Sequence, residues 1–118
     1  MQSILSALNQ TSSNIAASAI VSKDGLVMAA ILPEDMNENY LGGMTAALFS
    51  VGFRSSPQLV GGAEQMMVKG PQGYILMTHA GKEAFLTVVT KTHAELDHLF
   101  AELKHSANKV TDCLRASH

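Results

Sequence analysis

Three residues with metal-binding side chains recur at helical spacing near the end of the chain: His98, Glu102 and His105, at i, i+4 and i+7. In a helix this spacing places them on one face, and imidazole and carboxylate groups are ligands for zinc. They lie opposite the apolar residues Leu96 and Leu103, on a face where polar side chains are ordinary. A solvated helix face explains them, so we expect no metal site.

Motifs for nucleotide and nucleophile chemistry are incomplete. A P-loop needs a glycine five residues before its Gly-Lys pair and a Ser or Thr after it. Gly81 and Lys82 lack that upstream glycine and are followed by Glu83. The S-x-x-K spacing of Ser106 and Lys109 is short, and neither an S-D-N nor a K-T-G motif accompanies it. We therefore expect a protein that is not an enzyme and that has no cofactor.

The composition narrows the class of protein. The chain has 118 residues, 47% of them hydrophobic and 15% charged, with 8 Lys and Arg against 10 Asp and Glu. This length predicts a single domain over 1–118, and the slightly negative charge argues against nucleic acid as a partner. The one cysteine, Cys113, has no partner for an intrachain disulfide, and no signal peptide or lipidation motif is recognisable. We expect a cytoplasmic protein that does not insert into a membrane.

The elements that must position these residues begin with a short helix over 2–10 and two apolar strands over 15–22 and 26–32. Asp24 and Gly25 lie between the strands and favour a tight hairpin turn. In the second strand both alternating sets of side chains are apolar, which is typical of a strand covered on both sides. Helices are therefore expected on both faces of the sheet.

A central helix follows the hairpin. Asp35 and Glu38, three residues apart, are typical of a capping pair at a helix start. We expect the helix to continue to about Phe53. The segment from Arg54 to Pro57 is expected to end it, because proline lacks the backbone N–H that a helix requires.

The rest of the chain predicts three strands and a last helix. The strands span 63–69, 74–80 and 85–90, and Thr92 with Glu95 forms a capping box before a regular apolar stripe. The order is αββαβββα. We predict an α+β fold with a five-stranded antiparallel sheet and helices on both faces.

The central helix has two apolar stripes and no charged residue over 39–53, so it cannot face water broadly. One stripe consists of Leu41, Met44, Leu48 and Val51. The other, about 150° away at 100° per residue, consists of Gly42, Ala46, Phe49 and Phe53. One sheet covers one stripe, so we predict that the second faces another chain, with small residues allowing a close approach and Phe49 as anchor. The alternative is a loop of the same domain over this stripe.

The strand after the central helix is predicted to lie at an edge of the sheet, where unpaired backbone groups can pair with a neighbouring copy. Met66 and Val68 project from one face of this strand and Met67 from the other. We predict a symmetric homodimer that uses this strand and the central helix. Pairing with a related paralogue remains an alternative.

The chain resembles the Roadblock/dynein light chain family over nearly its whole length. The resemblance lies in the order of elements, the hairpin from Val21 to Ala29, the apolar central helix and the Gly-rich loop before the third strand. The resemblance implies the sheet described above and a homodimer in which the central helices pack together. It also implies no catalytic activity of the chain's own. Bacterial and archaeal members typically partner small Ras-like GTPases, whereas eukaryotic members serve as adapters.

The resemblance leaves open how such a protein would influence a GTPase. A regulator can order the GTPase's own residues, or it can supply an arginine in trans. Arg54, just after the expected end of the central helix, is the candidate for this contact. A cation placed favourably at a helix C-terminus is the simpler explanation of Arg54. An adapter without effect on nucleotide turnover and a small-molecule sensor are the alternative functions.

Overall fold

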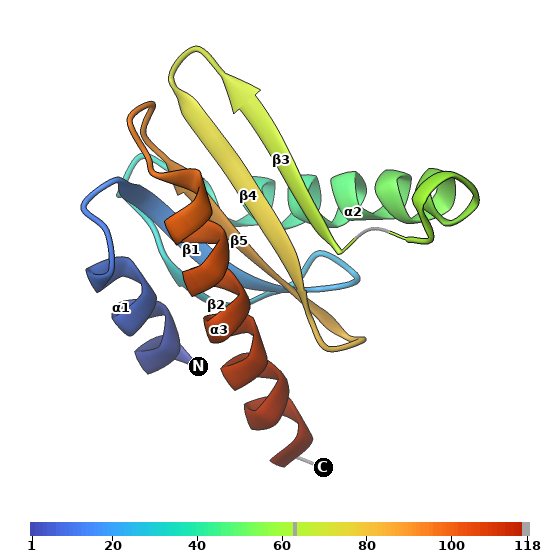
Figure 1. Ribbon diagram of the computed structural model, residues 1–118. Coiled ribbons are helices and arrows are strands. Elements are labelled where there is room, and N and C mark those ends of the chain that lie inside the picture. Colours follow the sequence, from blue (N-terminus) through green and yellow to red (C-terminus); the bar gives the residue numbers. More distant parts are fainter. Residues whose placement is uncertain (63, 117–118) are drawn as a thin grey trace.

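The computed structural model describes residues 1–62 and 64–116, without the side chains of 53–56. Three helices and five strands follow one another in the predicted order αββαβββα (Figure 1). Their bounds are α1 Gln2–Gln10, β1 Ile15–Ser22, β2 Val27–Ile31, α2 Glu38–Val60, β3 Gln65–Gly70, β4 Gly73–Ala80, β5 Ala84–Thr90 and α3 Leu96–Ala116.

The five strands form one antiparallel sheet in the order β2-β1-β5-β4-β3, which confirms the predicted fold class. Helices α1 and α3 lie side by side on one face, and α2 crosses the other face (Figure 1). The strands β2 and β3 are the two edges of the sheet. The edge position predicted for the third strand is confirmed.

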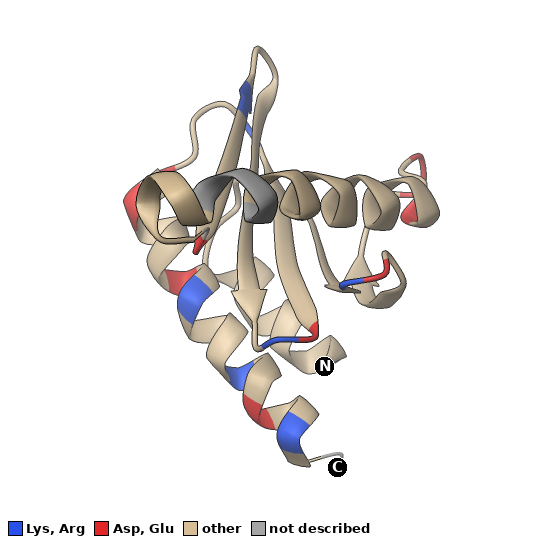
Figure 2. Ribbon diagram, turned by 90° about the vertical axis from the view of Figure 1, so that its right-hand side faces the viewer, with Lys and Arg blue, Asp and Glu red and all other residues tan. Residues whose placement is uncertain are grey.

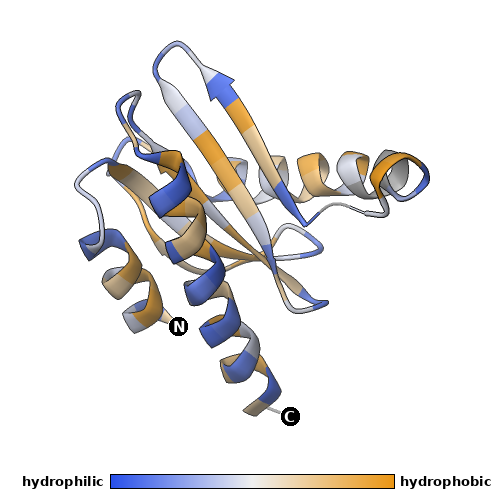
Figure 3. Ribbon diagram, in the orientation of Figure 1, coloured by the Kyte–Doolittle hydropathy of each residue, from blue (hydrophilic) through white to orange (hydrophobic). Residues whose placement is uncertain are grey.

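The larger part of the core lies between the sheet and the helices α1 and α3. Leu5 and Leu8 of α1 are buried beside Leu99 and Leu103 of α3, and Leu86 is buried at the centre of the sheet. Hydrophobic residues follow the strands, whereas the outer surface of α3 is hydrophilic (Figure 3). Burial of these apolar side chains is the main source of stability of this layer.

Two helices begin at different residues from those predicted. In α2 the cap is Asn37, whose side-chain oxygen accepts a hydrogen bond from the Tyr40 N–H at 3.0 Å, so Asp35 is not the cap. In α3 the Glu95 carbonyl accepts from the Leu99 N–H at 3.0 Å and the helix starts at residue 96, so the capping box of Thr92 is wrong. Both predictions were wrong because another residue nearer the helix makes the first turn's contacts.

Helix α2 is longer than predicted, because it continues through Pro57 to Val60. A proline inside a helix is unfavourable, because it lacks the N–H and its ring clashes with the carbonyl of residue i−4, yet α2 accommodates Pro57 without ending there. The helix ends at Gly61, whose φ of 84° is the left-handed conformation that glycine adopts readily. The predicted third strand started at Ala63, which lies outside the described residues, and β3 begins at residue 65.

Candidate functional site

The stripe of α2 that was predicted to face another chain packs against its own sheet and hairpin. Gly42 is buried, and a Cβ atom at this position would lie 2.5 Å from the carbonyl oxygen of Gly25. The Cβ of Ala46 is 3.6 Å from the position that a Cβ of Gly25 would take. The predicted partner contact at Gly42 is therefore corrected, because the β1–β2 hairpin of the same chain covers this residue, whereas Ala46 beside it is only partly buried and its partner contact stays a prediction.

Phe49 belongs to the same correction. Its ring is 0% exposed and stacks on Phe85 of β5, with 4.1 Å between ring centroids and 1° between planes. His79 of β4 flanks both rings at 5.0 Å and 5.3 Å. Phe49 therefore anchors α2 to its own sheet rather than to a partner. The side chain of Phe53, the last member of the stripe, lies outside the described residues.

The exposed side of α2 carries a different set of residues. Leu41 is buried and Leu48 is partly buried against the sheet. Tyr40, Gly43, Ala47 and Val51 are exposed along one side of the helix. Val51, which the sequence placed on the sheet side, is 66% exposed. The surface that α2 offers to a partner is therefore this side of the helix.

The end of α2 extends this exposed apolar surface past the edge of the sheet. The helix continues beyond β3 (Figure 1), and none of its described side chains after Glu38 is charged (Figure 2). Leu59 and Val60 in its last turn are 80% and 77% exposed. Sequence reasoning missed these two residues because it ended the helix before Pro57. The signal that could have found them is the apolar pair directly before Gly61.

The face of the sheet that α2 crosses is only partly covered. Helix α2 packs on β2, β1 and β5, and leaves a groove of about 410 Å³ toward the β3–β4 turn. Val68, Ile75 and Val89 stand opposite one another on β3, β4 and β5 and line this groove. An uncovered apolar groove of this kind is typical of an interaction surface.

The edge strand β3 adjoins this groove. Met66 is partly buried against the cluster of Phe49, and Met67 is 48% exposed on the opposite face of the strand. Val68 is exposed at the rim of the groove. The three residues predicted for the interface are thus divided: Met67 and Val68 are available to a partner, and Met66 mainly supports α2.

The two edges of the sheet differ in how well they can accept another strand. The edge strand β2 has an irregular register against β1 between Ile20 and Val21, and the Gln2 side chain donates to the Ala30 carbonyl at 2.9 Å. The pairing of β3 with β4 is regular over all six residues of β3. Bulges and side-chain caps hinder the addition of a strand. The open edge suited to pairing is therefore β3.

The residues with metal-binding chemistry do not form a centre. In the described part of the chain, no three His, Cys, Asp or Glu side chains are grouped to hold a metal ion. The Nε2 atom of His98 lies 3.4 Å from the Thr11 carbonyl oxygen, and His105 is exposed.

Helices long and apolar enough to cross a bilayer do not occur among the described residues. The side chain of Arg54 lies outside the described part.

Comparison with known proteins places this geometry in a family. The family model of the Roadblock/LC7 domain matches residues 1–90. The chain belongs to the Roadblock/LC7 family. The uncharacterized protein MJ0714 of Methanocaldococcus jannaschii is 35% identical over 108 residues, which cover 91% of this chain and 90% of that protein. Membership in this family supports a regulatory or adapter role.

Solved structures show the same fold. The Roadblock/LC7 domain from Streptomyces avermitilis is 21% identical, covers 98% of both chains and superposes with a TM-score of 0.88. A structure of MglB with a tetrameric arrangement is 16% identical over 93% of this chain and 84% of that one, with a TM-score of 0.86. The five-stranded sheet with helices on both faces is therefore the Roadblock/LC7 fold.

Proposed function

We propose that the protein is a non-enzymatic, homodimeric regulator or platform that binds a small Ras-like GTPase in the cytoplasm. The observation that supports the dimer is that one chain carries two complementary apolar surfaces. An exposed apolar helix end extends past β3, and an apolar groove beside β3 is uncovered. Two copies related by a two-fold axis can each place the helix end over the other's groove.

In this dimer the β3 strands pair across the two-fold axis and continue the sheet. Leu59 and Val60 of one copy lie over Val68 and Ile75 of the other, and the exposed side of α2 packs against its counterpart. The uncharged side of α2 supports this arrangement, because the centre of an interface is depleted of charged residues. The tetrameric arrangement of the related MglB supports self-association of the fold.

A paired variant tests the dimer. Leu59→Glu/Val60→Glu places two charges on the exposed helix end, where folding of the monomer does not depend on them, and is expected to sediment as a folded monomer. Leu26→Glu/Met28→Glu is the matched control, because both are exposed apolar residues at the opposite edge of the sheet, Leu26 directly before β2 and Met28 within it. The control is expected to remain a dimer, as the parent protein is. A dimer of the helix-end variant would overturn this interface.

The GTPase partner rests on family membership. We propose Arg54 as a contact to the GTPase. In the sequence it lies near the residues of the dimer surface. Purified small Ras-like GTPases of the same cell, loaded with GDP or with a non-hydrolysable GTP analogue, provide the test. Binding that depends on the nucleotide, together with a changed hydrolysis rate, supports a regulator. Binding to either form with unchanged hydrolysis supports an adapter, and no binding overturns the GTPase partner.

A further inference from the structure

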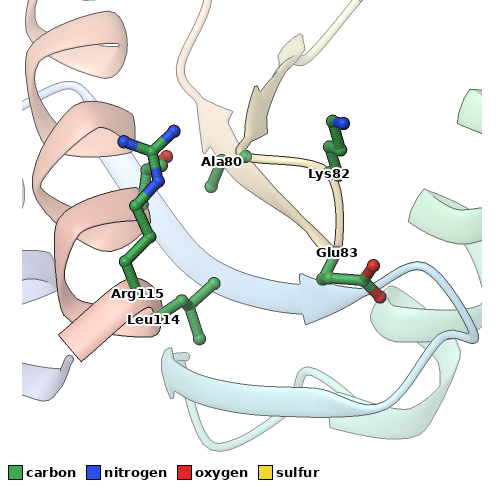
Figure 4. Close-up of a pocket in the computed structure, with 7 residues that line it drawn as sticks. Ala80, Lys82, Glu83, Leu114 and Arg115 are labelled. Atoms are coloured by element: carbon green, nitrogen blue, oxygen red, sulfur yellow. The ribbon is translucent and has the colours of Figure 1, made fainter. Parts of the chain in front are cut away.

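A second pocket, of about 410 Å³, lies between the β4–β5 turn and the last turns of α3 (Figure 4). Residues 80–83 of the turn line one side, and Thr111, Leu114 and Arg115 line the other. The pocket is formed with α3, whereas the proposed dimer uses α2 and the β3 edge. It therefore stays open in the proposed dimer and is independent of it.

The inner part of this pocket is apolar. Ala80 is fully buried, and Leu114 is partly buried against the main core. The Thr111 hydroxyl donates to the Ala107 carbonyl of its own helix at 2.9 Å. The Thr111 methyl carbon lies 3.4 Å from the position that a Cβ of Gly81 would take. The turn thus passes close to α3 at Gly81, which has no side chain, and carbon atoms form the walls of the inner part.

The mouth of the pocket carries two positive charges. Figure 4 shows the Lys82 and Arg115 side chains on opposite sides of the opening, with the Glu83 carboxylate turned away from Arg115. Glu83 is engaged by Lys23 of the neighbouring hairpin, with 3.2 Å between Nζ and Oε2. Lys82 and Arg115 form no ion pair with any residue that the structure describes. The charge at the opening is therefore positive.

We propose that this pocket binds a carboxylate that carries a short aliphatic group. The carboxylate would lie between the Lys82 ammonium and the Arg115 guanidinium, which can bind both oxygens of a carboxylate. The aliphatic group would lie against Ala80, Leu114 and the Thr111 methyl. A ligand of this kind satisfies both parts of the pocket, whereas a bare anion leaves the apolar wall unused and a neutral alkyl compound leaves the cations unpaired.

Two probes that differ in one functional group test the charge requirement. In a titration followed by backbone amide NMR, N-acetyl-leucine is expected to shift the signals of Gly81, Lys82 and Leu114 to saturation. N-acetyl-leucinamide has the same aliphatic group without the negative charge and is expected to leave them unmoved. Equal shifts with both probes, or none with either, would overturn the proposal. A parallel titration with hexanoate distinguishes the source: tighter hexanoate binding indicates a free small acid, and tighter N-acetyl-leucine binding indicates a chain terminus.

Variants locate the binding to this pocket. Lys82→Gln/Arg115→Gln is expected to weaken N-acetyl-leucine binding roughly four- to tenfold, since each exposed ion pair contributes only a modest amount. Lys104→Gln/Lys109→Gln removes two exposed lysines of α3 that do not line the pocket and lie outside the proposed dimer surfaces, and it is expected to leave the affinity unchanged. The same loss in both variants would show a non-specific charge effect and would overturn the site. The sedimentation of both variants stays that of the parent protein if the proposed dimer is correct, so the two proposals fail separately.

Discussion

A Cβ atom on Gly42 would lie 2.5 Å from the carbonyl oxygen of Gly25, so helix α2 and the β1–β2 turn touch through their backbones. Gly25 has a φ of 89°, which the turn requires and which other residues rarely adopt. The contact holds the first half of α2 against the hairpin. Helix α2 continues from this contact past the edge of the sheet, so the contact helps to set the direction of the helix (Figure 1).

Gly42→Ala is expected to destabilise the protein by about 1–3 kcal/mol, since the added methyl group meets backbone that cannot move aside. Gly43→Ala is the matched control, because no described atom other than its chain neighbours and the nearby backbone of its own helix lies within 4 Å of its Cβ position, and alanine favours the helix. The control is expected to be neutral or up to about 1 kcal/mol more stable. Urea unfolding of both in the monomeric Leu59→Glu/Val60→Glu background measures the difference, and equal stabilities would contradict the close contact.

Phe49→Ala is expected to lower the free energy of unfolding by about 3–5 kcal/mol, because it removes a buried ring that stacks on Phe85. Tyr40→Ala changes an aromatic residue of the same helix that is 72% exposed, and its effect is expected within about 0.5 kcal/mol. Thermal and urea unfolding of the monomeric background compare the two. A mild effect of Phe49→Ala in this background, combined with loss of the dimer when the same substitution is made in the parent protein, would restore the interpretation of Phe49 as a partner contact.

Thr87→Val is expected to stabilise the protein by about 1 kcal/mol. The Thr87 hydroxyl is buried in the middle of β5 and has no hydrogen-bond partner among the described residues. Replacing it with a methyl group of similar size removes a polar group that folding takes out of water. Thr90→Val on the same strand loses a hydrogen bond to the Lys91 carbonyl and is expected to be neutral or destabilising. A Thr87→Val protein less stable than Thr90→Val would contradict this assignment.

The elements and their order followed from the sequence because local signals determine them. Alternating apolar residues predicted the strands, and Asp24 with Gly25 predicted the hairpin turn that the structure has. The bounds of α2 were less well predicted, since Pro57 and Gly61 both indicate a helix end and only the glycine supplies the positive φ that ends it. The edge position of β3 was correct because the strand begins a meander.

The face of α2 that meets the sheet could not be predicted from periodicity. Two stripes of similar apolar character give the same pattern whichever of them is buried. The choice is made by tertiary contacts: the close approach of Gly25 to Gly42, and the place of Phe49 between His79 and Phe85. These contacts join residues far apart in the sequence. The groove of Val68, Ile75 and Val89 was likewise invisible, because it exists only where α2 leaves the sheet uncovered.

Cysteine substitution along β3 tests whether the two β3 strands pair across the two-fold axis. Single cysteines at 65–69, each in a Cys113→Ser background, are compared for disulfide-linked dimer under mild oxidation. In an antiparallel pair only directly opposite residues have Cβ atoms close enough for a disulfide, and equivalent residues are opposite only at the two-fold axis. Cross-linking is therefore expected to peak at one or two adjacent positions and to fall on both sides.

The opposite edge strand supplies the control for this scan. Met28→Cys, also in the Cys113→Ser background, is exposed on β2 and is expected to remain uncross-linked at the same protein concentration. Adding Leu59→Glu/Val60→Glu to the most reactive β3 cysteine is expected to abolish its cross-link, because the strand pairing and the helix end belong to one interface. Uniform reactivity along β3, equal reactivity at position 28, or a cross-link that survives the helix-end charges would each show random collision rather than a paired edge.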